Sequence, residues 1–147
     1  MASTDSTGTQ PHGVSGGPRL LLRLEGLGLL LCALAGFAES GQSWWLFVAL
    51  ILVPDLSMLG YLAGSRAGAV LYNAVHVTIL PLALAVAGLA QGDLRILAVA
   101  AVWLAHIGID RALGYGLKYA AGFGFTHLGR VGRAVPVKAS KKAIDAT

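Results

Sequence analysis

Residues 94–115 read LRILAVAAVWLAHIGIDRALGY, and this stretch decides what kind of protein the chain forms. It is long enough for a helix that crosses the ~30 Å hydrocarbon layer of a membrane, which takes about 20 apolar residues. Its second half nevertheless carries His106, Asp110 and Arg111. Ionisable groups within such a helix are costly, so they usually face a bundle interior and mark a functional site. The stretch therefore predicts a membrane protein with a polar site inside it.

Three further apolar runs precede this one, at about residues 19–38, 44–62 and 67–87, and each is close to the length that a membrane helix needs. Hydrophobic residues make up 56% of the 147-residue chain and charged residues 12%, which is about half of the usual share in soluble domains. Backbone surrounded by lipid must satisfy its own hydrogen bonds, which favours helices. We predict an all-α fold, an integral membrane four-helix bundle within residues 19–120.

The two ends of the chain differ from this apolar middle. Residues 1–18 lack the apolar surface that would offset their ordering entropy, so we expect a disordered tail. Beyond Tyr115 glycines are too dense for a fifth span, and we expect an interfacial segment in which Lys118 snorkels to the headgroups. Residues 121–147 are predicted to continue this interfacial segment and to end in a basic cytoplasmic tail.

Basic residues also predict the orientation. Lys and Arg fall mostly on the side of the membrane that holds both termini, whereas only Arg95 falls on the other side. Because Lys and Arg collect in the cytoplasm, we expect a protein of the bacterial inner membrane with both termini cytoplasmic. The same rule accounts for the basic tail without nucleic acid as a partner. The expected partners are the lipid bilayer and a lipid or membrane-adjacent substrate, and a homodimer is left open.

Two prolines and three glycines predict irregular backbone in the middle helices. Pro54 and Pro81 each remove a backbone donor and should kink their helices. Gly60, Gly64 and Gly68 recur every four residues around the turn between the second and third runs. This spacing is compatible with a close-packing seam and equally with a tight turn.

Polar residues from all four runs fall in one layer of the membrane. At the helical rise of ~1.5 Å per residue, they lie about 6 to 12 Å from the cytoplasmic ends of their helices. These residues are Glu25, Asp55, Asn73, His76, His106 and Asp110. Spacings of three and four residues place the polar pairs of the third and fourth runs on one helix face each. The pattern predicts a polar chamber in the cytoplasmic leaflet.

The residue types in this layer suit a divalent metal such as zinc, because two imidazoles and two carboxylates are available. We predict Asp55, His76, His106 and Asp110 as metal ligands and Glu25 as a general base. No cofactor other than this metal is expected. Further polar members of the site are predicted at Asn73, Arg111, Tyr115 and His127.

Each of these residues also has a purely structural explanation. Glu25 could pair with Arg23 or Arg19 near the headgroups, and Asp55 could cap the half-helix beyond the proline. Asp110 and Arg111 could form an ion pair that locks the bundle, and the histidines could be hydrogen-bonded interior residues. His127 either folds back to the chamber mouth or lies in a solvated turn.

Three blocks of the sequence resemble a known family. Residues 54–61 (PDLSMLGY), 72–76 (YNAVH) and 106–129 (HIGIDRALGYGLKYAAGFGFTHLG) look like the blocks of a bacterial family of small membrane proteins, domain of unknown function 4260. The resemblance covers nearly the whole membrane region. It implies a membrane protein and names no reaction.

A more distant likeness implies a chemistry. Pro-Asp in one helix, His in the next and His-x-x-x-Asp in the last is similar to the layout of inner-membrane metal-dependent hydrolases, which in turn resemble zinc phospholipases C. The matching positions are Asp55, His76, His106 and Asp110. Those proteins have Pro-Asp-x-Asp where Ser57 stands here, and a longer His-Arg-x-x-Thr-His-Ser block, which puts one or more of the implied ligands in question.

The sequence therefore leaves two functions open. The first is a metal-dependent hydrolase of a lipid or another membrane-adjacent ester, in which a metal activates water. The second is a non-enzymatic membrane protein, a small transporter or an assembly factor, whose polar layer is a proton relay or a packing network. Stoichiometric metal binding distinguishes the two.

Overall fold

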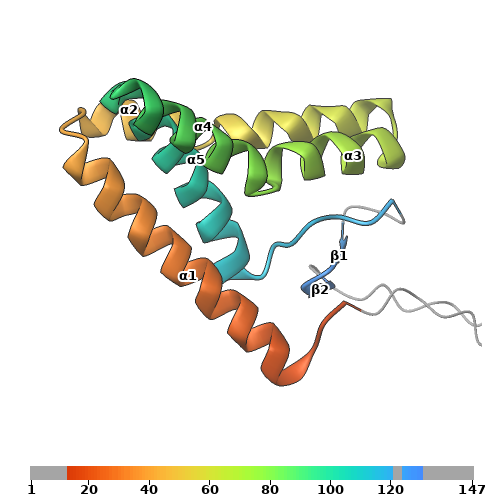
Figure 1. Ribbon diagram of the computed structural model, residues 1–147. Helices are drawn as coiled ribbons and strands as arrows, with labels where there is room; N and C mark the ends of the chain where they lie inside the picture. The colour runs from red at the N-terminus through yellow and green to blue at the C-terminus, as the bar shows by residue number, and fades with distance from the viewer. Residues whose placement is uncertain (1–12, 121–123, 131–147) are drawn as a thin grey trace, which may run out of the picture.

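The computed structural model describes residues 13–120 and 124–130, and this part of the chain is an all-α membrane fold with four apolar spans (Figure 1). The spans are Gly16–Glu39, Trp44–Ala63, Ser65–Gln91 and Leu94–Leu113, each long and apolar enough to cross a membrane. The predicted fold class is confirmed. Of the tail predicted at residues 1–18, residues 1–12 lie outside the described residues, whereas its last three residues belong to the first span, which begins at Gly16. Of the segment predicted at residues 121–147, residues 121–123 and 131–147 lie outside the described residues.

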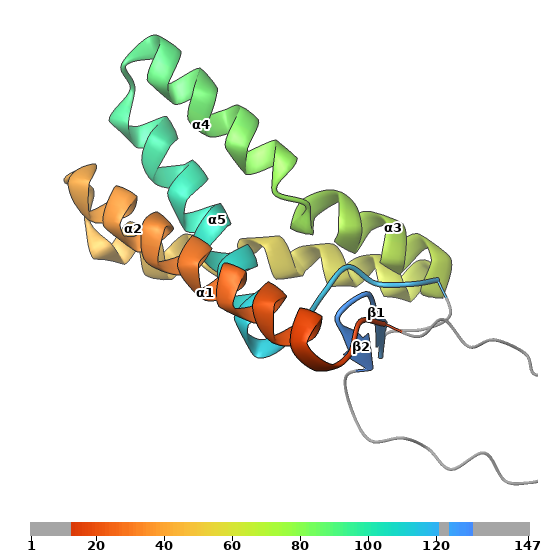
Figure 2. The same cartoon turned by 60° about the horizontal axis from the view of Figure 1, so that its bottom comes forward.

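Helices α1 (Gly16–Glu39) and α5 (Leu94–Leu113) pack against each other (Figures 1 and 2). Two glycines allow their backbones to approach closely. A Cβ atom added to Gly26 of α1 would lie 2.6 Å from the Cβ of Arg111, and one added to Gly108 of α5 would lie 2.7 Å from the amide nitrogen of Leu30. This contact fixes α5, which carries His106 and Asp110.

The sequence at each end of α5 sets its limits. Asp93 Oδ1 accepts hydrogen bonds from the N–H groups of Arg95 at 2.8 Å and Ile96 at 3.3 Å, and so caps the first turn. Gly114 ends the helix with a φ of 94°, in the left-handed region that favours glycine. The chain therefore leaves the helix after Leu113 and turns back toward the interior.

The second span changes its helix type at Pro54. Helix α2 (Trp44–Leu50) ends four residues before this proline, and the 3-10 helix η1 (Val53–Ala63) continues the span. Proline has no N–H to donate to the carbonyl of Leu50, and its ring crowds that carbonyl. The predicted kink is thus a change to 3-10 geometry, in which residues three apart share a face.

The third span breaks ahead of Pro81 for the same reason. Helix α3 (Ser65–His76) ends before Val77, whose ψ of 137° is extended, and helix α4 (Ile79–Gln91) follows. Val77 is the residue whose carbonyl Pro81 would crowd in a continuous helix. Figure 2 shows α3 and α4 meeting at this bend. His76 is consequently the last residue of α3.

The glycine spacing between η1 and α3 reflects both a tight turn and a close-packing seam. Gly64 forms the turn between them with a φ of 111°. Gly60 and Gly68 lie in the contact, since a Cβ on Gly68 would come within 2.3 Å of the Tyr61 ring. The close pairing of the two helices places one face of each next to α5.

A short hairpin follows α5. Strands β1 (Phe125–Thr126) and β2 (Gly129–Arg130) pair antiparallel, and Lys118 forms a bridge to Thr126. The Val14 N–H also donates to the carbonyl of His127 at 2.8 Å, so the start of the described chain meets this hairpin. Within residues 13–120 and 124–130 the chain after α5 forms no further long helix.

Candidate metal centre

Three ionisable side chains from three different segments meet inside the protein. They are Asp55 of η1, His76 at the end of α3 and His106 of α5, and one ligand atom of each lies within 4.8 Å of the others. His76 Nε2 is 3.1 Å from His106 Nε2, and Asp55 Oδ1 is 3.8 Å and 3.6 Å from these two nitrogens. Both histidines are buried and Asp55 is half-buried. The fold thus brings together three of the four predicted ligands.

These separations suit a divalent ion. Ligand atoms at about 2.0–2.1 Å from a tetrahedral zinc lie about 3.3–3.4 Å from one another. The distances between the three ligand atoms, 3.1 to 3.8 Å, fall on both sides of this value. Small side-chain adjustments would therefore let all three share one ion. Three protein ligands leave a position open for water or substrate, as in catalytic zinc sites.

The backbone orients His76 for this role. Its Nδ1 lies 2.9 Å from the carbonyl oxygen of Tyr72. A carbonyl only accepts, so Nδ1 carries the proton, and the neutral ring presents the lone pair of Nε2 to His106 and Asp55. The ring also stacks on Tyr72, with centroids 3.7 Å apart and planes 11° apart. Histidines that bind metals usually donate their other N–H to such a carbonyl or to a carboxylate.

Asp110, the fourth predicted ligand, lies beside the other three. Its Oδ2 is 3.7 Å from His76 Nε2 and accepts a hydrogen bond from the Tyr72 hydroxyl at 2.7 Å. It does not belong to the group of ligand atoms that lie within 4.8 Å of one another. The four-residue spacing from His106 places it one helical turn further along α5, on the predicted face.

A chamber of about 290 Å³ opens beside Asp55 and Asp110. Its walls are Asp55, Met58, Tyr72, Asp110, Tyr115 and Lys118. The prediction that Lys118 snorkels to the headgroups is wrong, because this residue is only 4% exposed. Its Nζ lies 4.7 Å from the centre of the Tyr72 ring and 5.9 Å from that of Tyr115. The faces of two aromatic rings attract the ammonium group into the wall of the chamber.

Asn73 anchors the chain segment that carries Lys118. Its Nδ2 donates to the Lys118 carbonyl at 2.8 Å, and its Oδ1 accepts from the Lys118 N–H at 2.7 Å. Burial lowers the pKa of Lys118, while the carboxylates of Asp110 and Asp55 act in the opposite direction. Sequence reasoning missed Lys118 as a site residue, because the contact that places it joins residues 45 positions apart.

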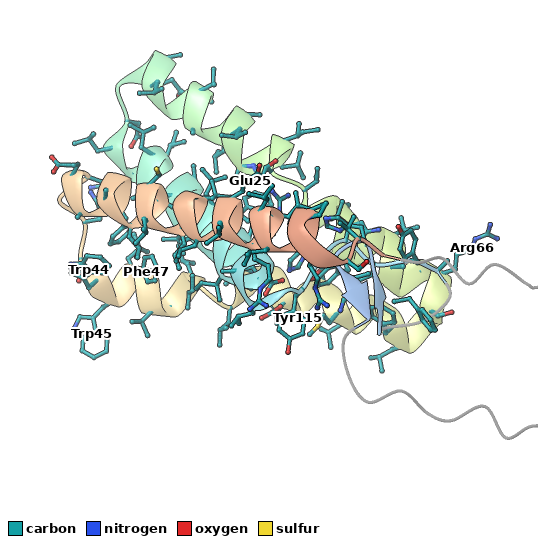
Figure 3. The ribbon with its side chains drawn as sticks, turned by 90° about the horizontal axis from the view of Figure 1, so that it is seen from below. Glu25, Trp44, Trp45, Phe47, Arg66 and Tyr115 are labelled. Atoms are coloured by element: carbon teal, nitrogen blue, oxygen red, sulfur yellow. The ribbon has the colours of Figure 1, made fainter. Side chains whose placement is uncertain are left out.

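Glu25, the predicted general base, lies elsewhere. It is exposed on α1, and no contact found among the described residues joins it to the chamber. In Figure 3 Glu25 lies on one side of the α1 ribbon, and Tyr115, which follows α5, lies on the other. The alternative pairing of Glu25 with Arg23 or Arg19 is not among the ion pairs found in the described residues. Arg23 Nε instead donates to the Ala112 carbonyl at 2.7 Å.

His127 and Arg111 also lie outside the cluster. His127 Nδ1 accepts a hydrogen bond from the Leu117 N–H at 2.8 Å, and the backbone N–H of His127 donates to the Leu117 carbonyl at 3.0 Å. Burial lowers the pKa of His127, and the charge of Arg111 acts in the same direction. Within the described part of the chain, the contacts at ion-pair distance join a histidine to Asp55 or Asp110, so the proposed lock between Asp110 and Arg111 is not among them.

Comparison with known proteins gives a family and no activity. Residues 19–131 match a family described as "Domain of unknown function (DUF4260)", which covers the membrane domain and the hairpin. No curated protein and no solved structure matches the chain.

Proposed function

The chain belongs to the DUF4260 family, and from the geometry of its own site we propose that it is a metal-dependent hydrolase acting on a lipid or another membrane-adjacent ester. One observation carries the proposal. Asp55, His76 and His106 come from three separate segments of a membrane domain, yet their ligand atoms lie within 4.8 Å of one another. Leaving such groups together in an apolar interior is costly unless they hold a partner.

The residues present fit a divalent ion in donor type as well as in distance. Imidazole nitrogens and carboxylate oxygens are common ligands of zinc, and three of them plus an open position make a catalytic set. The chemistry that such an ion would supply is the activation of water at neutral pH and the polarisation of the ester. Asp55, His76 and His106 would be its ligands.

Asp110 is the residue best placed to accept a proton. Its carboxylate lies next to the triad, at 3.7 Å from His76 Nε2, and the Tyr72 hydroxyl fixes its orientation. In this proposal Asp110 takes a proton from the water whose oxygen adds to the ester carbonyl, and it returns this proton to the leaving alkoxide as the ester C–O bond breaks. The products are an acid and an alcohol. The role assigned from the sequence to Glu25 thus passes to Asp110.

The chamber favours a substrate with an anionic group. Lys118 Nζ stands in its wall over the ring of Tyr72, and the 290 Å³ volume is large enough for a lipid headgroup fragment rather than a water molecule alone. A buried ammonium supplies a strong electrostatic contact to phosphate or carboxylate where water is scarce. A membrane lipid is therefore the substrate class that we propose.

Two carboxylate variants test the roles. Asp55→Asn should lose both the metal and hydrolysis of phosphatidylglycerol in vesicles, whereas Asp110→Asn should keep the metal and lose hydrolysis. Removal of a general base typically costs about 10²–10⁴-fold in rate. Metal-loaded wild-type protein that hydrolyses no ester in such vesicles would refute the enzymatic proposal, and Asp110→Asn with wild-type turnover would refute the assignment of Asp110.

One observation favours the non-enzymatic alternative. The two Nε2 atoms of His76 and His106 are 3.1 Å apart, which is within hydrogen-bond distance if His106 donates. The cluster would then be a packing or relay network without metal. In that case His106→Asn should preserve the fold better than His106→Leu, because only asparagine retains a polar partner for the buried groups.

A further inference from the structure

A second cavity lies against the same three helices as the metal centre. It has a volume of about 310 Å³ and is lined almost wholly by apolar side chains of α2, η1, α3 and α5. The lining residues are Leu50, Val53, Pro54, Ser57, Leu71, Val75, Val99, Val102 and Trp103. None of them is a candidate ligand, and none lines the chamber beside Asp55 and Asp110, so the two cavities are separate.

Helical spacing divides the two cavities. On η1, Pro54 and Ser57 line the apolar cavity, while Asp55 and Met58 line the polar chamber, as expected for a helix with three residues per turn. On α3, Val75 lines the cavity and its neighbour His76 belongs to the cluster. The polar and apolar spaces therefore lie side by side, on neighbouring faces of the same helices.

The apolar cavity contains one polar group that lacks a partner. Ser57 is 8% exposed, and its hydroxyl oxygen forms no hydrogen bond within the described part of the chain. Ser57 lines this cavity and does not join the metal cluster. A buried hydroxyl without a partner is costly, which indicates that a ligand with a hydrogen-bonding atom completes this site.

We propose that this cavity binds one acyl chain of a membrane glycerolipid, with the ester carbonyl of the chain at Ser57 and the lipid headgroup in the polar chamber. The surrounding bilayer would supply this ligand. The rim residues Val53 and Leu71 are exposed on membrane spans, so the cavity opens toward lipid. A cavity of about 150 Å³ holds a benzene molecule, so one twice as large takes roughly a dozen carbon atoms.

Trp103 gives the cavity a fixed wall. Its Nε1–H donates to the Val75 carbonyl at 2.8 Å and so ties α5 to α3 where the cavity and the metal cluster adjoin. An acyl chain lying along this wall would bring its ester group toward His76 and His106. This inference rests on the proposed function only in taking the neighbouring cluster as a catalytic metal centre. Binding of the acyl chain does not itself require metal.

Photochemical cross-linking tests the inference. The full-length protein is placed in vesicles of phosphatidylethanolamine and phosphatidylglycerol that contain a trace of phosphatidylglycerol with a diazirine in one acyl chain. After irradiation, cross-links are mapped by mass spectrometry. We expect them to concentrate on Leu71, Val99 and Trp103 rather than on Val86, which is 65% exposed on the outer face of α4.

Two variants and one control sharpen the result. Val99→Phe fills the cavity and should abolish the enrichment at its walls, whereas Val86→Phe adds the same bulk to an exposed position and should leave it intact. Ser57→Ala should lower cross-linking by roughly two- to tenfold, the value of one neutral hydrogen bond. Equal labelling of Leu71 and Val86 in wild type overturns the inference, and this comparison decides it even if Val99→Phe fails to fold.

Metal analysis of the same samples separates this inference from the proposed function. Enriched cross-links in protein that holds no metal support the acyl-chain site and remove the hydrolase. Bound metal with evenly spread cross-links has the opposite meaning, since it supports the metal centre and removes the acyl-chain site.

Discussion

His76 Nε2 lies 3.1 Å from His106 Nε2, although the two residues are 30 positions apart and belong to different spans. The break before Pro81 ends α3 at His76, and the Gly26–Gly108 contact of α1 with α5 fixes the helix of His106. The helix break before Pro81 and the close glycine packing therefore both help to position the cluster.

The contact between α1 and α5 is tested by two glycines of the same helix. Gly26→Ala should destabilise the protein by about 1–3 kcal/mol, because the new methyl group would overlap the Cβ of Arg111. Gly28→Ala meets nothing within 4 Å and should be neutral or stabilising by up to about 1 kcal/mol. Reversible unfolding in detergent measures both, and equal effects would mean that α1 does not pack through Gly26.

The hairpin contact should weaken in acid. Burial lowers the pKa of His127 below its ordinary value of 6.5, so the docked residue stays neutral where the undocked one takes up a proton. Protonation would also remove the lone pair that accepts the Leu117 N–H. As the pH falls from 6.5 toward the lowered pKa, docking should therefore lose stability. The hydrogen-exchange protection factor of the Leu117 amide measures this loss.

His127→Gln is the control for this effect, since glutamine does not titrate. Its protection factor at Leu117 should be independent of pH over the same range. A wild-type protection factor that stays constant or rises on acidification would contradict the assignment.

The orientation of the chain remains a prediction from its basic residues. We expect both termini in the cytoplasm, with Gly41 on the opposite side of the membrane. Single cysteines introduced at Gly41 and Lys141 in a Cys32→Ala background should react with an impermeant maleimide from outside and inside, respectively. Labelling of position 141 from the outside of intact cells would reverse the topology.

The sequence predicted the four spans well, because length and apolar composition alone identify a membrane helix. It also predicted which faces of α3 and α5 carry polar groups, since spacings of three and four residues determine a shared face. The change from α-helix to 3-10 helix at Pro54 could not be predicted. Removal of one donor allows a kink or a change of helix type, and packing against α3 selects between them.

Two residues show why part of the candidate site could not be predicted. Glu25 has the same depth as the other polar residues, but depth does not determine the direction in which a side chain projects from its helix. Lys118 lies in a glycine-rich stretch that is typical of an interface, yet two hydrogen bonds with Asn73 hold its segment inside. Such long-range contacts leave no mark in local sequence.

The most direct test of the account is metal analysis of the purified chain and its histidine variants. After exposure to zinc, manganese and iron, followed by removal of free ions, we expect wild type to retain a stoichiometric divalent ion. His76→Ala and His106→Ala should lose it while keeping their helical content, and His127→Ala should retain it, because His127 lies outside the cluster. Wild-type protein that holds none of the three metals would contradict the metal centre.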